Sequence, residues 1–353
     1  MLFHLAAYLQ HSLSALNVIH YVSFRAMAAL LTSLLCSFLF GTAFIEISRR
    51  LFRSKAREWT PEMHRSKDNM PTMGGIFILS VVTFNSLLWC NLAKVHVWLF
   101  LACMFSFGAL GFWDDWQKIK KHKGIPARTK FLWQLCVALF FITALIKTGL
   151  SQEISFPFFK WLHPDLGWLF IPWAVFIIVG CSNAVNLTDG LDGLAITSLI
   201  PNFATFSLIC YLAGNYKIAN YLHIPFADSA EIVVIGATLV GASLGFLWYN
   251  TYPAQIFMGD IGSLALGAAL ALMALLCKQE LLLVISGGLF VVEALSVIVQ
   301  VASYRWFGKR MFKMAPIHHH FELIGWQESK ITMRFGIISL ILCLIALMTL
   351  KMR

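Results

Sequence analysis

The chain has 353 residues, of which 59% are hydrophobic and only 12% are charged. Because average soluble proteins carry about 25% charged residues, this composition excludes an ordinary soluble enzyme and predicts an all-α polytopic membrane protein. The net charge of +10 would favour nucleic acid as the partner of a soluble protein. Here basic loops and anionic lipid headgroups explain it more simply, so we expect contact with membrane lipid and no nucleic acid.

Long apolar stretches recur along the whole chain, and no separate soluble domain fits between them. A transmembrane helix needs about 20 predominantly apolar residues. We therefore expect a single integral membrane domain over residues 1–353. The predicted spans number about ten, at residues 22–45, 74–89, 95–112, 131–146, 168–185, 194–213, 232–248, 261–276, 281–304 and 335–350.

Lys and Arg are concentrated in three of the connections between these spans. Segments 46–73, 113–130 and 305–334 hold seven, six and six of the 27 basic residues. Basic connections stay on the cytoplasmic side of a membrane. Since an even number of spans separates each of these segments from the next, all three are predicted to be cytoplasmic, with both termini outside.

Residues 182–193 form a short acidic segment between two apolar runs and contain no Lys or Arg. Asn186, Asp189 and Asp192 repeat every three residues, so their side chains are expected to share one face of a helical turn. Ionisable groups near hydrocarbon are costly and usually mark function. A divalent cation with a phosphate substrate would explain the segment. The alternative is a capped turn at the start of the next span, but capping does not need both acids.

Two further acidic sites lie at the ends of predicted spans. Asp114 and Asp115 follow the span 95–112, and Asp260 precedes the span 261–276 between two glycines. Adjacent carboxylates repel each other unless a cation neutralises them, and Mg²⁺ with substrate phosphates is a suitable cation. An interfacial acid pair and a helix N-cap, respectively, are the alternatives for the two sites.

The run His318-His319-His320 lies in the last basic segment. Three consecutive His cannot all face one metal ion from regular structure, so hydrogen bonds to phosphate or substrate are favoured over metal ligation, and a plain polar loop is the alternative. Lys67 and Lys130 are candidate phosphate partners, and each is equally well explained as an orientation charge.

Two polar residues, Glu293 and Gln300, are seven residues apart inside the span 281–304. They would share one helix face and either line a cavity or form a satisfied polar contact between helices. Beyond them, residues 306–313 alternate aromatic and basic side chains, which is typical of an amphipathic segment lying in the membrane plane.

Counting spans places all of these polar clusters on the same side of the membrane. Two spans separate Asp115 from Asp189, two separate Asp189 from Asp260, and two separate Asp260 from the triple-His run. We therefore expect one cytoplasmic site built from four connections.

At these motifs the sequence closely resembles the phospho-N-acetylmuramoyl-pentapeptide transferases. They are a branch of the polyprenyl-phosphate N-acetylhexosamine-1-phosphate transferase superfamily. The resemblance spans nearly the whole chain in order, and the triple-His segment looks specific for this branch. The matching residues are Met70-Pro71-Thr72-Met73-Gly74-Gly75, Asp114-Asp115, Asn183 to Gly193, Met258-Gly259-Asp260 and Ala315 to Glu322.

The resemblance implies an enzyme of the bacterial cytoplasmic (inner) membrane, with ten spans and outward termini. It implies a Mg²⁺-dependent exchange in which UDP-N-acetylmuramoyl-pentapeptide and undecaprenyl phosphate give the first lipid-linked peptidoglycan precursor (lipid I) and UMP. An in-line single displacement needs fewer assumptions than a covalent intermediate. The oligomeric state is left open, and a homodimer is compatible with the sequence.

The resemblance also implies roles for individual residues. Asp260 looks like the principal metal ligand, and Asp114 and Asp115 look like the catalytic pair, which either holds metal or deprotonates the lipid phosphate. His318, His319 and His320 join the catalytic set. The implied substrate-binding residues are Lys67, Thr72, Lys130, Asn186, Asp189, Asp192, Asn250 and Phe257.

Two other classes of membrane protein are alternatives for the function. An intramembrane prenyltransferase also uses Mg²⁺ and acidic motifs, but its paired motifs space the acids differently and give the triple-His run no role. An ion-coupled transporter predicts acids near the middle of spans. Here the acids sit at span ends, and only Glu293 lies well inside one.

Overall fold

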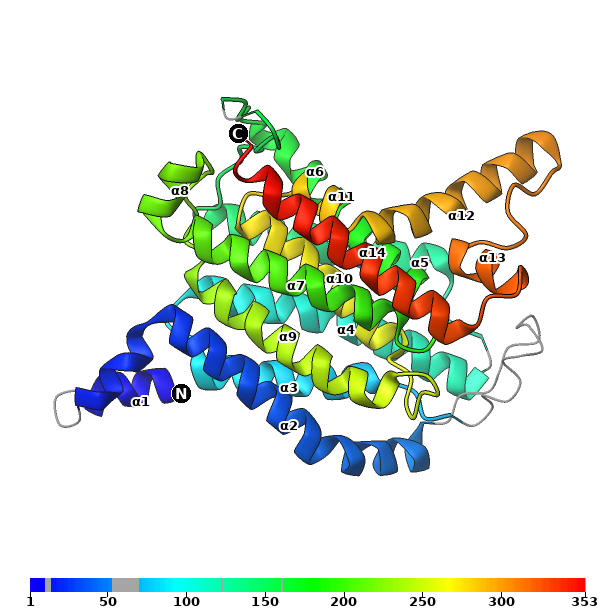
Figure 1. Cartoon of the computed structure of the whole chain (residues 1–353), viewed down its shortest axis with the longest axis horizontal. Helices are drawn as coiled ribbons and strands as arrows, with labels where there is room; N and C mark the ends of the chain where they lie inside the picture. Colours follow the sequence, from blue (N-terminus) through cyan, green and yellow to red (C-terminus); the bar gives the residue numbers. More distant parts are fainter. Residues whose placement is uncertain (10–13, 53–69, 122, 160, 353) are drawn as a thin grey trace.

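The computed structural model describes residues 1–9, 14–52, 70–121, 123–159 and 161–352. These residues are predominantly helical (Figure 1). An isolated antiparallel bridge joins Glu153 and Asp165. In chain order the elements are α1 (Leu2–Leu9), η1 (Ser14–His20), α2 (Val22–Leu51), α3 (Gly74–Trp89), α4 (Val95–Lys121), α5 (Ala127–Lys147), η3 (Gly167–Leu169), α6 (Phe170–Thr188), α7 (Leu194–Ala213), α8 (Tyr216–Leu222), α9 (Ala230–Asn250), α10 (Gly259–Leu276), α11 (Leu282–Ser286), α12 (Gly288–Phe307), α13 (Ile317–Leu323) and α14 (Glu328–Thr349).

Nine helices within the described ranges are long and apolar enough to cross a membrane: α2, α4, α5, α6, α7, α9, α10, α12 and α14. The remaining expected span coincides with α3, which has 16 residues. At 1.5 Å per residue α3 is about 24 Å long, shorter than a hydrocarbon core of about 30 Å. The prediction of an all-α, multi-pass membrane protein is confirmed. The side of the membrane that each terminus faces stays a prediction.

Three elements differ from the expected ones. Helix α4 continues to Lys121, nine residues beyond the predicted end, because Asp114 and Lys118 pair one turn apart and lysines fill the last turn. The predicted span 281–304 is divided at Gly287 into α11 and α12. The connection at 214–230 contains the short helix α8, which is not among the expected spans.

Helix α10 forms the centre of the bundle. Every residue from Ile261 to Leu276 is buried. It packs against α4, α6, α3 and α7, while α9 packs against α2 and α7 (Figure 1). The many Gly and Ala residues of α10 let neighbouring backbones come close, as is usual between membrane helices. This packing fixes the N-terminus of α10, with Asp260, beside the C-terminal end of α4.

Helix α12 leaves the bundle. In Figure 1 it extends away from the other helices, and the chain then returns to α13 beside the N-terminal end of α14. Its buried residues all lie in its first half: Leu289, Phe290, Glu293 and Ser296.

Candidate active site

Three carboxylates meet where α4 ends and α10 begins. One oxygen atom from each of Asp114, Asp115 and Asp260 lies within 4.8 Å of the other two. Asp114 and Asp115 are buried, and Asp260 is half-buried. The two helices approach closely at Gly111, where a Cβ atom would lie 2.3 Å from the backbone oxygen of Asp260. A glycine at this position is therefore needed for the three acids to meet.

Two lysines lie among these carboxylates. The Lys118 Nζ atom is 2.8 Å from Asp114, 3.2 Å from Asp115 and 3.0 Å from Asp260. The Lys130 Nζ atom is 2.6 Å from Asp260 and 3.5 Å from Asp114. From the sequence, Lys130 is expected at the site, whereas Lys118 is only one of the basic residues that set orientation. Its spacing of three and four residues from the two acids was the signal, and this signal holds only if α4 continues past the membrane.

The donor atoms of this cluster suit a magnesium ion. Carboxylate oxygens are the hard ligands that Mg²⁺ takes in proteins, usually together with substrate phosphates. Three of them converge from two packed helices, and a backbone N–H of α10, at Ile261, points to Asp115 at 3.4 Å. The ammonium group of Lys118 contacts the same three carboxylates. A metal ion and Lys118 would therefore compete for these carboxylates.

The segment 182–193 reaches the cluster from the end of α6. Asn186 donates a hydrogen bond of 2.8 Å to the hydroxyl of Ser263, which lies one turn beyond Asp260. Asp189 follows the last residue of α6. Burial, and then the charges of Asp260, Asp115 and Asp192, raise the pKa of Asp189 to about 8. Such a group holds its proton at neutral pH and is able to donate a hydrogen bond.

Asp192 and Asn250 hold the chain that leads into α10. The buried Asp192 carboxylate accepts the N–H of Ala254 at 3.0 Å. The buried Asn250 side chain donates to the carbonyl of Ile256 at 2.8 Å. Both side chains therefore shape the loop before Asp260. Their predicted contact with the nucleotide is not tested by these bonds and stays a prediction.

Phe257 and Thr72 lie on the other side of this loop. The Phe257 N–H donates to the carbonyl of Pro71 at 2.9 Å, and its carbonyl accepts the N–H of Gly74 at 2.8 Å. The Thr72 hydroxyl lies beside Gly259, the residue before Asp260. Two of the sequence motifs are thus joined through their backbones. Lys67 lies outside the described residues.

His318 is fully buried and bonded to a membrane helix. Its Nδ1 atom is 3.1 Å from Glu293 Oε2, which also accepts the N–H of Ile317 at 2.9 Å. The His318 ring lies against the acidic segment, because a Cβ atom at Gly190 would be 2.3 Å from its Nε2 atom. Of the two alternatives for Glu293, the structure shows the polar contact between helices.

The other two histidines have different partners. His319 Nδ1 lies 2.6 Å from Glu322 Oε2 within α13, and His320 Nδ1 accepts the N–H of Lys313 at 3.2 Å. The three rings therefore serve separate contacts and do not point to one common metal ion. The hydrogen bonds to phosphate or substrate that the sequence led us to expect stay a prediction.

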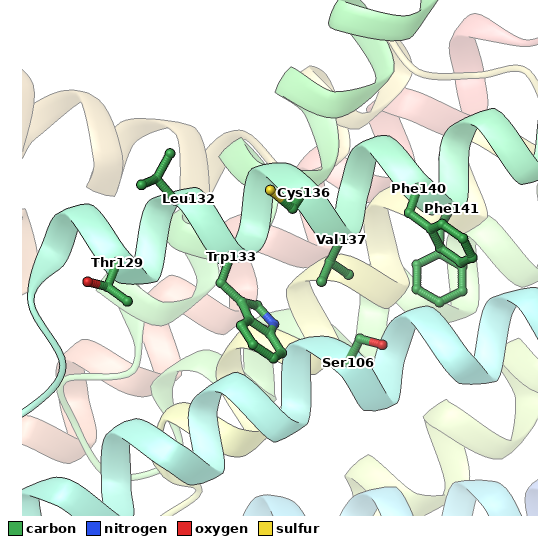
Figure 2. A pocket seen from close by; sticks show the side chains of 8 residues that line it. All are labelled: Ser106, Thr129, Leu132, Trp133, Cys136, Val137, Phe140 and Phe141. Atoms are coloured by element: carbon green, nitrogen blue, oxygen red, sulfur yellow. The ribbon is translucent and has the colours of Figure 1, made fainter.

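An apolar groove of about 570 Å³ opens beside the cluster, between α4 and α5 (Figure 2). It begins at Thr129, next to Lys130, and continues along α5 to Phe141. Trp133 faces it and also makes an edge contact with Trp113, the neighbour of Asp114, at 6.2 Å between ring centres.

The fold and this site define a multi-pass membrane transferase. The family described as Glycosyl transferase family 4 matches residues 97–278, just over half of the chain. The matched stretch contains α4 from its third residue onward and the whole of α10, and so all three carboxylates.

Three relatives match the chain over its full length and theirs. Those from Citrifermentans bemidjiense and Geobacter sp. (strain M21) are each 50% identical over 366 residues, and that from Nitratidesulfovibrio vulgaris is 50% identical over 361 residues. All three are named phospho-N-acetylmuramoyl-pentapeptide-transferase. The chain belongs to this family of phosphosugar transferases.

Proposed function

We propose that the protein transfers phospho-N-acetylmuramoyl-pentapeptide from its UDP derivative to undecaprenyl phosphate, giving lipid I and UMP. The observation that carries this proposal is the cluster of three carboxylates and two lysines at the ends of α4 and α10. The full-length match to relatives of that name supports the choice of donor. The basic segments around the cluster favour its placement at the cytoplasmic face of the bacterial inner membrane.

The reaction is a displacement at phosphorus. An oxygen of the lipid phosphate forms a bond to the β-phosphorus of the donor while the bond from that phosphorus to the bridging oxygen breaks. UMP leaves with the electron pair of that bond. Lys118 and Lys130 would offset the charge that gathers on the phosphate oxygens, which is usually the largest contribution to catalysis of this kind. Asp115, buried beside them, would either hold metal or take a proton from the lipid phosphate.

The Mg²⁺ requirement belongs to this proposal. Asp260, Asp114 and Asp115 would hold the ion, which when bound supplies further positive charge to the diphosphate. Lys118 would then turn from the carboxylates toward phosphate.

The two substrates would reach the cluster from different sides. On one side lie Asn186 and Asp189, which suit a nucleotide sugar because they offer hydrogen-bond donors and acceptors. On the other side the groove between α4 and α5 suits the isoprenoid tail of the acceptor (Figure 2). The acceptor phosphate would then meet Lys130 at the end of the groove.

The proposal is tested with the purified protein, UDP-N-acetylmuramoyl-pentapeptide, undecaprenyl phosphate and Mg²⁺. We expect a lipid-linked muramoyl-pentapeptide to form. Undecaprenyl diphosphate, which has no free phosphate monoester, serves as the control acceptor. Absence of product in monodisperse protein across several lipids and detergents would refute the proposal. Transfer of a prenyl group from a prenyl diphosphate would favour the prenyltransferase alternative.

A further inference from the structure

Residues 305–313, which we call the cationic arm, combine four basic residues with exposed aromatic side chains. Arg305, Lys309, Arg310 and Lys313 are all exposed. Trp306 is 78% exposed and Phe307 is 73% exposed. No Asp or Glu occurs in the sequence between Glu293 and Glu322. In the described parts of the chain, Arg305, Lys309 and Arg310 have no acidic partner.

The arm is held in one conformation by a polar residue of α12. Gln300 Oε1 accepts the N–H groups of Met311 and Phe312 at 3.0 and 2.9 Å, and its Nε2 donates to the carbonyl of Phe312 at 3.0 Å. The Ser303 hydroxyl donates to the carbonyl of Lys309 at 2.9 Å. Through these bonds Gln300 holds the arm folded back onto α12.

The position of the arm places it at the membrane surface. It begins in the last turn of α12, in the half of that helix without buried residues, and it stands away from the bundle (Figure 1). Lys313 also donates to the carbonyl of Leu323, so the far end of the arm rests on α13. Basic clusters directly beyond a membrane helix attract anionic lipids, and Trp and Phe enter the headgroup region beside them.

We propose that the cationic arm is a binding site for the headgroups of anionic phospholipids. Arg305, Lys309 and Arg310 would contact the lipid phosphates, while Trp306 and Phe307 enter the headgroup boundary. The site is separate from the acidic cluster, whose own lysines are paired with carboxylates. It is also preorganised, since Gln300 and Ser303 order the basic segment through its backbone.

The test uses electron paramagnetic resonance without either substrate, so its outcome does not depend on the proposed reaction. The full-length protein is reconstituted in phosphatidylcholine bilayers with a trace of spin-labelled phosphatidylglycerol or spin-labelled phosphatidylcholine. We expect the wild type to immobilise more of the anionic label than of the zwitterionic label. Lys309→Gln with Arg310→Gln should remove at least half of this preference.

Two further variants distinguish lipid binding at a specific, ordered site from a general effect of positive charge. Lys120→Gln with Lys121→Gln removes the same charge from the exposed end of α4 and should lower the preference much less. Gln300→Leu keeps every charge but releases the arm, and should lower the preference as the double arm variant does. Equal losses for the arm and α4 variants, or no loss for the arm variant, would overturn the proposal. A change from dimer to monomer in the arm variant without a change in lipid preference would assign the arm to a second copy of the chain.

Discussion

Lys118 is the residue that most changes the interpretation of the site. Its ammonium group contacts all three carboxylates, so it supplies positive charge where the sequence motifs supply only acids. Charge-assisted contacts of this kind are stronger than neutral hydrogen bonds. We therefore assign Lys118 both to ordering the carboxylates before substrate binds and to the phosphates afterwards.

This assignment predicts a large difference between two neighbouring lysines. Lys118→Gln should lower kcat on the order of 10²-fold at saturating Mg²⁺, as removal of one charge-stabilising group does in other enzymes. Lys120→Gln should leave kcat unchanged, since its ammonium lies over the ring of Trp116 at 4.6 Å. Steady-state rates of UMP release measure both. Equal rates for the two variants would remove Lys118 from the site.

Asp189 makes stability depend on pH. Its pKa is raised to about 8 in the folded protein, whereas an unfolded Asp ionises near 4. Between these values the folded chain binds more protons, so the contribution of Asp189 to the free energy of unfolding falls as pH rises. Without Mg²⁺, the melting temperature of Asp189→Asn relative to wild type should therefore increase from about pH 5 to about pH 9.

The control for this trend is Asp165→Asn, in the connection between α5 and α6. Its Oδ1 atom accepts the N–H of Gly167, a bond that Asn also makes. This variant should show no comparable trend. A pH-independent difference for Asp189→Asn would mean that the carboxyl is already ionised at neutral pH.

At the scale of single residues, sequence alone located the acids but not all their partners. Asp114, Asp115 and Asp260 were recognisable because charge at the end of a membrane span is costly. Lys118 lies in a basic segment whose charge is equally well explained by the orientation of the protein in the membrane, so the sequence did not single it out. The link from Glu293 to His318 joins residues 25 positions apart, and no local pattern encodes it.

At the scale of helices, the contact between α4 and α10 positions the site. It depends on Gly111, which lies against the backbone of Asp260. A side chain at this point would push apart the two helices that carry the three acids. Small residues at such contacts are typical of membrane helix packing.

Two glycine substitutions test this contact. Gly111→Ala should reduce turnover by at least about tenfold, because displacements of about 1 Å in catalytic groups have large effects on rate. Gly180→Ala is the matched control, since a Cβ atom at Gly180 of α6 has no neighbour within 4 Å. Turnover of monodisperse protein in detergent is the measurement. Normal activity of Gly111→Ala would show that the helix contact is not needed for catalysis.

The helices themselves were largely predictable, because every membrane span must satisfy its own backbone hydrogen bonds. The ends of the helices were less predictable. Apolar content stops at Phe112, but pairs between Asp114 and Lys118 carry α4 to Lys121. The division at Gly287 depends on how α11 and α12 pack against α14 and α6, which a single sequence does not reveal.

At the scale of the molecule, four connections far apart in sequence meet at one end of the bundle. Counting spans predicted this, and contacts among Asp115, Asp260, Asn186 and His318 with their neighbours show the convergence. The orientation of the bundle follows from the positive-inside rule alone. It therefore needs a direct test.

Topology is measured with a membrane-impermeant maleimide in intact bacterial spheroplasts. Lys351→Cys, exposed at the C-terminal end, should be labelled above the background of the wild-type cysteines. Lys120→Cys, exposed beside the acidic cluster, should be labelled only after the membrane is permeabilised. The reverse pattern would place the cluster outside and contradict the proposed location of the reaction.

The central claim is that phosphosugar transfer takes place at the cluster of Asp114, Asp115 and Asp260. The most direct measurement compares UMP release and lipid-linked product in wild type and Asp260→Asn, in the same bilayers with donor, acceptor and Mg²⁺. We predict equal amounts of UMP and lipid product from the wild type, and neither from folded Asp260→Asn. Near-normal formation of both products by Asp260→Asn would show that the reaction takes place elsewhere.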